Sequence, residues 1–238
     1  MVRRDKITSH FVSHKDAYLK QYDMKNHDII NFFMRTQFSG NASILDVGGG
    51  NGNLLDNIVK YFPNQGKPKL YNLELCEFYR NYQINKEITF LVGSALSLPF
   101  KDQTFDFVVS NALLHHLVGK SRRESTRNAG QAVREFIRVT KPGGYVIINE
   151  IYNESRAFAH TLFLLTSLGA LFHFHWGRLG WYKDVIVCFL TPSEIDDLMT
   201  DLQIIDRKLN RSNVSLRFRL TLLHSNVGYY FLVGRRTL

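Results

Sequence analysis

Residues 44–53 read Ile-Leu-Asp-Val-Gly-Gly-Gly-Asn-Gly-Asn, and no other segment constrains the fold as strongly. A short apolar run, typical of a buried strand, ends in the carboxylate of Asp46 and is followed by glycines at alternate positions 48, 50 and 52. Glycine accepts positive φ and, without a Cβ, lets the backbone approach a ligand closely. The segment predicts a strand and a tight ligand-binding turn, with a turn that binds nothing as the simpler alternative.

The spacing of these glycines separates two kinds of adenosine-cofactor site. The dinucleotide fingerprint is G-x-G-x-x-G, and it places a pyrophosphate at the N-terminus of the following helix. In this chain the third glycine comes one residue early, at Gly52, and Asn53 stands where the fingerprint has glycine. Open α/β sheets bind ligands at the carboxyl ends of their strands, so Asp46 favours a ligand that carries positive charge.

Strand-like and helix-like segments alternate through the middle of the chain. Apolar strand patterns occur at 43–47, 70–73, 88–92, 105–110 and 145–149, and helical spacing occurs around 54–62 and 129–140. This alternation predicts a parallel sheet with helices on both faces. Before residue 43 the apolar residues recur at helical spacing. Toward the C-terminus, Thr191-Pro192-Ser193-Glu194 predicts a helix start, and alternation over 214–222 and 229–233 predicts closing strands.

The length of 238 residues and a hydrophobic content of 45% fit one globular domain. We divide it into a helical segment (1–42), a ligand-binding core (43–150), an apolar insertion (151–190) and a C-terminal helix with strands (191–238). Cys76 and Cys188 are far apart, which argues against a disulfide framework or structural zinc and favours buried, reduced thiols. The N-terminus shows no signal-peptide pattern, so we expect a cytoplasmic protein.

Residues 157–177 contain no charged side chain. Three histidines, two threonines and a serine interrupt the segment, which argues against a membrane span. We expect an apolar lid over a pocket; a helix lying on a membrane surface is the second interpretation.

Positive charge is unevenly distributed along the chain. The formal net charge is +9, and residues 207–238 hold seven Lys or Arg and no acidic residue. A second cluster comprises Lys120, Arg122, Arg123 and Arg127. This distribution fits either an anionic partner, such as nucleic acid or a membrane surface, or an ordinary basic surface.

Polar or small side chains follow the next three strand-like segments. Glu74 ends the second segment, 22 residues after Gly52, where a carboxylate can accept hydrogen bonds from both ribose hydroxyls. Ser94 follows the third segment and can hydrogen-bond an adenine edge. The fourth segment leads into Ser-Asn-Ala-Leu-Leu-His-His-Leu at 110–117. Because the carboxyl ends of parallel strands share one edge of a sheet, we expect these residues to form one site.

With these motifs in order, the chain from Ile44 to Glu150 resembles class I S-adenosylmethionine-dependent methyltransferases. The further motifs that carry the resemblance are Leu-Glu-Leu, Gly-Ser-Ala-Leu-Ser-Leu-Pro-Phe and Arg-Val-Thr-Lys-Pro-Gly-Gly. The resemblance implies a Rossmann-like α/β fold with a seven-stranded, mostly parallel sheet in the order 3-2-1-4-5-7-6. It also implies that strand seven is antiparallel and that the cofactor is S-adenosylmethionine.

The resemblance also implies a role for each motif position. The methionine end of the cofactor lies against Asp46, Gly48, Gly49 and Gly50, with Asn111 beside its amino group. Glu74 holds the ribose and Leu75 packs on the adenine, while Ser94 and Ala95 contact the adenine edge. The family often has Asp at the position of Ser94. Tyr22 either reaches the cofactor carboxylate or packs in the core of its helix.

Methyl transfer mainly requires that a nucleophile be aligned with the S–CH₃ bond, and a base is needed only if the acceptor must lose a proton. His116 is our candidate base, since a histidine titrates near neutral pH. Its neighbour His115 has a weaker claim because the pair also suits loop packing, and two histidines without a third ligand do not predict a metal site. Glu150 is either a second candidate base or a structural hydrogen-bond acceptor.

Three functions remain open from the sequence. The first is methyl transfer to a small acceptor, quinone- or lipid-like, under the apolar lid, whose aromatic residues suit such a ligand. The second is methylation of tRNA or another RNA through the basic surface, although no separate RNA-binding module is present. The third is a scaffold that binds the cofactor without catalysis. The sequence does not indicate the oligomeric state.

Overall fold

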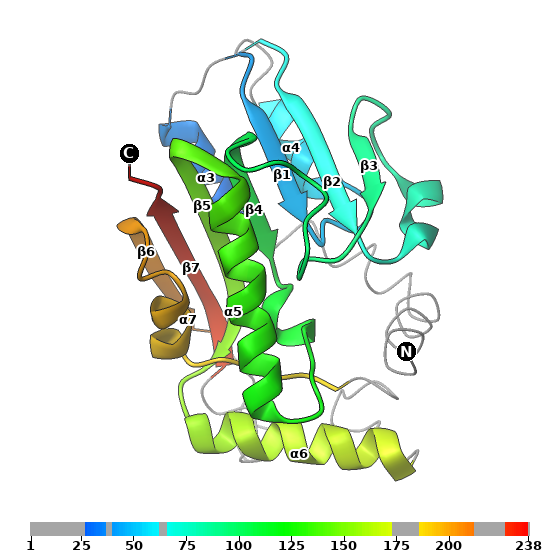
Figure 1. The fold of residues 1–238 in the computed structure, drawn as a ribbon, viewed down its shortest axis with the longest axis vertical. Helices are drawn as coiled ribbons and strands as arrows, with labels where there is room; N and C mark the ends of the chain where they lie inside the picture. Colours follow the sequence, from blue (N-terminus) through cyan, green and yellow to red (C-terminus); the bar gives the residue numbers. More distant parts are fainter. Residues whose placement is uncertain (1–26, 37–39, 62–65, 173–185, 212–226, 238) are drawn as a thin grey trace.

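A single seven-stranded sheet forms the centre of the protein (Figure 1). The computed structural model describes residues 27–36, 40–61, 66–172, 186–211 and 227–237. The strands are β1 (Ser43–Val47), β2 (Lys69–Glu74), β3 (Thr89–Val92), β4 (Phe105–Asn111), β5 (Thr140–Asn153), β6 (Gln203–Arg211) and β7 (Val227–Arg235).

The strand order is β3-β2-β1-β4-β5-β7-β6, as the resemblance implied. β1 pairs in parallel with β2 and β4, and the pairs β2–β3 and β4–β5 are also parallel. β7 runs antiparallel to both β5 and β6. The carboxyl ends of the five parallel strands β1 to β5 therefore meet along one edge of the sheet, and the predicted fold class is confirmed.

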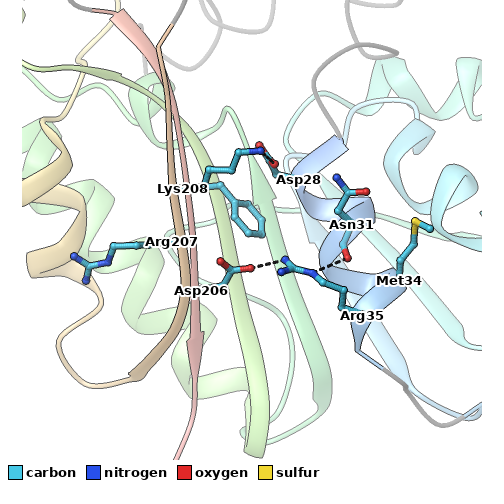
Figure 2. Close-up of a pocket in the computed structure, with 8 residues that line it drawn as sticks. Asp28, Asn31, Met34, Arg35, Asp206, Arg207 and Lys208 are labelled. Carbon is cyan, nitrogen blue, oxygen red and sulfur yellow. Dashed lines mark hydrogen bonds and ion pairs between the residues drawn. The ribbon is translucent and has the colours of Figure 1, made fainter.

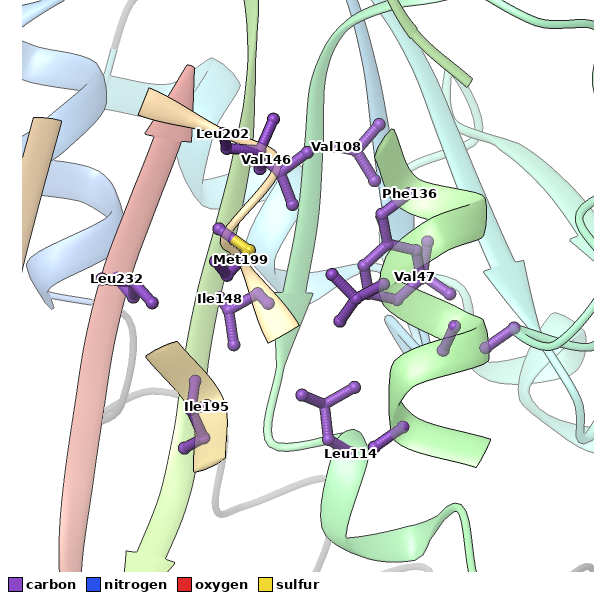
Figure 3. Packing of buried hydrophobic residues seen from close by; sticks show 14 of the residues in the cluster. Val47, Val108, Leu114, Phe136, Val146, Ile148, Ile195, Met199, Leu202 and Leu232 are labelled. Carbon is purple, nitrogen blue, oxygen red and sulfur yellow. The ribbon is translucent and has the colours of Figure 1, made fainter. Parts of the chain in front are cut away.

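Helices cover both faces of the sheet. α5 (Arg122–Val139) and α7 (Pro192–Leu198) lie on one face, where Figure 3 shows Phe136 near Val47 of β1 and Ile195 near Ile148 of β5 within one buried cluster. α3 (His27–Arg35) and α4 (Asn53–Tyr61) contribute to the core on the other face. Every residue of β1 is buried, because it lies at the centre of this three-layer arrangement.

Two helices begin at the caps that their sequences encode. Thr191 accepts a hydrogen bond from the Glu194 N–H (3.2 Å), and Glu194 accepts one from the Thr191 N–H (3.0 Å), so the predicted start of α7 is confirmed. Ser121 likewise accepts from the Glu124 N–H, and α5 begins at Arg122, seven residues before the predicted start. The first two turns of α5 are mostly polar, so they lack the apolar spacing from which a helix is predicted.

The strands near the end of the chain differ most from the sequence prediction. β5 is longer than residues 145–149 and begins at Thr140, immediately after α5. β6 was not predicted, because it is an edge strand with mostly exposed side chains and carries little apolar alternation. The predicted strand over 214–222 and the side chain of Tyr22 lie outside the described residues.

α6 (Arg156–Phe172) follows β5 and lies across the end of the domain toward which the parallel strands point (Figure 1). Its inward residues Ala159, Leu162 and Phe163 are buried. In the described part of the chain, no helix combines the length and the apolarity that a membrane span needs.

Candidate functional site

The glycine turn after β1 adopts the backbone conformation that its sequence predicts. Gly48, Gly50 and Gly52 have φ values of +77°, +53° and +80°. Side chains other than glycine rarely accept this region. The Gly48 N–H donates to the Leu73 carbonyl (2.7 Å), which ties the turn to the end of β2.

Asp46 is a buried carboxylate at the end of β1. It is 1% exposed, and neither of its oxygens accepts a hydrogen bond from the described residues. Burial, reinforced by the nearby charge of Glu74, raises the pKa of Asp46 to about 7. A buried carboxylate without a partner is strongly unfavourable. The geometry therefore suits a cationic ligand group, such as the ammonium group of S-adenosylmethionine, next to Asp46.

Asn72 of β2 completes the floor of the turn, and the sequence analysis missed it. Its side-chain amide donates to the Gly50 carbonyl (2.9 Å), and its Oδ1 has no partner among the described residues. A Cβ on Gly49 would lie 2.6 Å from that oxygen and would also collide with Asp46. Glycine is therefore required at position 49, because a larger side chain would collide with Asp46 and Asn72. In the sequence, Asn72 is recognisable only as an amide side chain between the apolar residues of its strand.

Glu74 is held in place by the backbone around it. Its carboxylate accepts hydrogen bonds from the N–H groups of Gly50 (3.1 Å) and Cys76 (2.9 Å). Burial raises the pKa of Glu74, and these backbone donors oppose the rise. Each carboxylate oxygen keeps a second acceptor position. Two further hydrogen bonds, such as those from the hydroxyls of a ribose, can therefore be accepted.

The three residues expected around the adenine differ in their exposure. Leu75 and Ser94 are partly exposed, whereas Ala95 is buried and belongs to the core. The Ser94 hydroxyl accepts a hydrogen bond from the Leu96 N–H (3.2 Å), which leaves its proton available to a ligand. The adenine contacts of these residues stay predictions.

The end of β4 carries the buried Asn111, which faces the buried Asn149 of β5, and a strained backbone. The side-chain amide of Asn149 on β5 donates to the Asn111 oxygen (2.8 Å). Ala112, the next residue, has a φ of +54°, which is uncommon for a residue with a Cβ. Such strain concentrates at functional sites.

Glu150 anchors the loop that carries the two histidines. Its carboxylate lies 2.5 Å from Nδ1 of His115 and accepts the Leu114 N–H (2.5 Å) and the Ile151 N–H (2.8 Å). His115 is 4% exposed, so it is a buried member of this network. This geometry favours a structural role for Glu150 over a role as a base.

His116 is partly exposed, and its ring centroid lies 4.0 Å from that of His115. His115, which is held by Glu150, therefore packs against the His116 ring and positions it. Tyr229 on β7 pairs with Ile151 of β5, next to Glu150, and burial together with the charge of Glu150 raises the pKa of Tyr229. The sequence analysis did not identify Tyr229, which looked like part of a strand.

A separate hollow of about 450 Å³ lies between α3 and β6 (Figure 2). The charged side chains within it are paired, with Arg35 2.6 Å from Asp206 and Lys208 2.6 Å from Asp28. None of the predicted site residues lines it. We therefore interpret this hollow as a junction between α3 and the edge strand.

Residues 45–148 match the family described as "Methyltransferase domain". Over 116 residues the chain is 33% identical to tRNA (carboxymethyluridine(34)-5-O)-methyltransferase of Arabidopsis thaliana. That alignment covers 49% of this chain but only 25% of the relative. The chain is also 26% identical over 178 residues to ubiquinone/menaquinone biosynthesis C-methyltransferase UbiE of Hahella chejuensis, covering 68% of each protein.

Among solved structures, the fold is similar to a chain from a complex of the Haloferax volcanii Trm112 methyltransferase activator with a methyltransferase. The TM-score is 0.65 at 16% identity, with 97% of both chains covered. This likeness supports the fold assigned from the sequence.

Proposed function

We propose, from the match of residues 45–148 to the methyltransferase domain family, that the chain methylates a small apolar acceptor. We infer that the cofactor is S-adenosylmethionine, as the motifs implied, and a solved structure with a similar fold, 16% identical, is described as one of the SAM-dependent methyltransferases. The observation that carries the methyltransferase proposal is the cofactor site: the carboxylate of Asp46, buried and without a hydrogen-bond partner among the described residues, near the fixed carboxylate of Glu74. Two acidic groups at adjacent strand ends match a ligand with one cationic end and a ribose.

We assign one part of the cofactor to each group of residues in this site. Asp46 pairs with the ammonium group, the glycine turn admits the methionine end, and Glu74 accepts the ribose hydroxyls. S-adenosylmethionine, when bound, supplies a methyl group on a sulfonium that is already a good leaving group. The protein then has to hold the acceptor in line with that methyl group.

The acceptor side is formed by the histidine loop and α6. We assign His116 as the base for acceptors that must lose a proton, and we assign Glu150 and His115 as positioning residues. α6 contributes an apolar segment with the buried side chains Leu162 and Phe163. An apolar acceptor suits this composition. The longer match to the quinone-pathway relative adds support.

RNA is the second candidate acceptor. The plant tRNA methyltransferase is 33% identical over the matched region. In addition, the exposed residues Lys120, Arg123 and Arg127 follow the histidine loop within a few positions of the sequence. Phosphate contacts of this kind make RNA binding strongly dependent on salt.

A paired measurement separates the two acceptors. We expect the purified protein to methylate a demethylated quinone precursor in the presence of S-adenosylmethionine, and we expect little affinity for tRNA at physiological salt. The matched variant Asp46→Asn should fail in the methylation assay while remaining folded. Tight tRNA binding that weakens steeply with salt, together with methylated tRNA as the product, would replace the small-acceptor proposal with the RNA one.

A further inference from the structure

α6 presents an apolar stripe to solvent. Its outward residues Leu164, Leu165, Leu168 and Leu171 are 49%, 37%, 50% and 68% exposed, respectively. These positions recur at helical spacing, so the four side chains share one face. The outward face of a surface helix is ordinarily polar, and contiguous exposed apolar patches mark interaction sites. The stripe lies opposite the buried residues Ala159 and Leu162.

Exposed cations lie at the end of the domain where this helix begins. From residue 157 to the end of α6 there is no charged side chain, and Arg156 at its start has a side chain that is 78% exposed. Lys120, Arg123 and Arg127 are exposed at the start of α5, and within the described residues none of the three forms an ion pair.

Contacts to a single glutamate bring these cations and α6 to the same end of the domain. Glu194 lies 2.6 Å from Nη2 of Arg122 and 3.3 Å from Nε of Arg156, so the first turns of α5 and α6 meet there. Figure 1 shows α6 across the end of the domain toward which β1 and β2 point. The predicted cofactor residues at the ends of β1 and β2 face this same end.

We propose that the leucine stripe of α6, defined as Leu164, Leu165, Leu168 and Leu171, binds an anionic lipid surface. An apolar helical face flanked by Lys and Arg is the pattern of interfacial helices, which lie in the headgroup region with their apolar side inserted. The cations at the start of α5 add electrostatic attraction to anionic headgroups. Charge complementarity therefore favours a lipid surface over a neutral protein partner.

The inference deepens the proposed function and rests on it in one respect. A lipid surface at the site end of the domain would deliver an acceptor that is dissolved in the bilayer. Lipid binding itself needs neither S-adenosylmethionine nor turnover. It can therefore be tested independently, and Asp46→Asn should bind vesicles as the unmodified chain does even though its cofactor binding is lost.

Flotation with vesicles is the decisive experiment. We expect the full chain to float with vesicles of phosphatidylglycerol and phosphatidylcholine, and to float poorly with phosphatidylcholine alone. The triple variant Leu164→Gln, Leu168→Gln, Leu171→Gln should lose at least about tenfold in binding to the anionic vesicles, because interfacial binding scales with buried apolar area. The matched control replaces three exposed apolar residues elsewhere by Gln: Tyr61, Ile84 and Ile205.

A second pair of variants tests the electrostatic part. Replacing Lys120, Arg123 and Arg127 by Gln should weaken binding to anionic vesicles severalfold. The control replaces three exposed lysines ahead of β2, β3 and β4, at the opposite edge of the sheet, by Gln: Lys67, Lys86 and Lys101. Cofactor titration and circular dichroism of each variant show that the fold is kept.

Three outcomes would overturn the proposal. The first is a full chain that does not float with anionic vesicles, and the second is a leucine variant that floats as well as the unmodified chain. The third is a leucine variant that turns a dimer into a monomer in light scattering, because the stripe would then be the interface between two copies. The leucine variant can bind vesicles normally while the cation variant loses affinity for tRNA. In that case Lys120, Arg123 and Arg127 belong to an RNA surface, and the lipid proposal fails.

Discussion

Replacing Asp46 by Asn should stabilise the cofactor-free protein while removing its affinity for S-adenosylmethionine. The carboxylate is 1% exposed and has no hydrogen-bond partner among the described residues, so folding must bury a charge that nothing in the described protein compensates. Asparagine keeps the shape of the side chain and removes that charge. Functional sites often carry a local destabilisation of this kind.

The magnitude follows from the pKa of Asp46, which rises from an ordinary 3.8 to about 7 on folding. A tenfold change in proton affinity corresponds to about 1.4 kcal/mol, so the ionised side chain destabilises the folded state by about 4 kcal/mol at most. Between pH 4 and pH 7 the folded state holds a proton that the unfolded state has released. The contribution of Asp46 to stability is therefore fully present below pH 4 and is lost as the pH rises to about 7.

Urea unfolding at several pH values tests this reasoning. The free energy of unfolding of Asp46→Asn should exceed that of the unmodified protein by an amount that grows by about 1.4 kcal/mol per pH unit between pH 5 and pH 7, then levels off. Asp201→Asn, at an exposed position, is the matched control and should show no such growth. Calorimetric titration of S-adenosylmethionine should detect a loss of affinity of at least tenfold in Asp46→Asn alone.

A stability difference that is the same at pH 5 and pH 8 would refute the assignment of a buried, uncompensated charge. An unchanged affinity for the cofactor would refute the ammonium contact. The two readouts are independent, so the electrostatic argument and the ligand assignment can fail separately.

Gly49→Ala should lower stability by about 2 kcal/mol in urea unfolding and weaken cofactor binding in calorimetry, because the new Cβ collides with Asp46 and lies 2.6 Å from the Asn72 oxygen. Glu74→Gln should weaken cofactor binding about tenfold in the same titration, since an amide cannot accept as many hydrogen bonds as the carboxylate; equal affinity would exclude the ribose role. Glu150→Gln should lower stability by about 1–3 kcal/mol in urea unfolding, because the Leu114 and Ile151 N–H groups donate to different oxygens of the carboxylate and the amide has only one oxygen; unchanged stability would contradict the anchoring role. His116→Ala should lower turnover of a hydroxyl acceptor by about 10²-fold or more and remove the acidic limb of the pH–rate profile, while cofactor affinity stays the same; an unchanged profile would leave His116 without a role as base.

Local sequence patterns predicted the central strands and most of the candidate cofactor residues, because a glycine turn or a strand end is recognisable from a few neighbouring residues. Positive φ at Gly48 and Gly50 follows from glycine itself, and the capping box at Thr191 is complete within four residues. The strand order was an implication of the family resemblance that the ordered motifs carry. β6 was missed because an exposed edge strand has no apolar face to produce a periodic pattern.

Contacts between residues far apart in sequence could not be predicted in this way. Asn72 approaches the Gly50 carbonyl across 22 residues, and Glu150 reaches Leu114 across 36, so neither pairing leaves a local pattern. Sequence spacing alone also could not choose between a base and a structural acceptor at Glu150, since that choice depends on what surrounds its oxygens.

The sequence by itself determined the central strands, the glycine turn and the two acidic strand ends, because turn chemistry and strand alternation are local properties of the chain. Only the tertiary structure decided which groups are buried together. It left the Asp46 carboxylate without a hydrogen-bond partner among the described residues, placed Glu150 behind the histidine loop and turned the leucines of α6 outward. Burial and charge compensation depend on packing between distant segments, and that packing exists only in the folded chain.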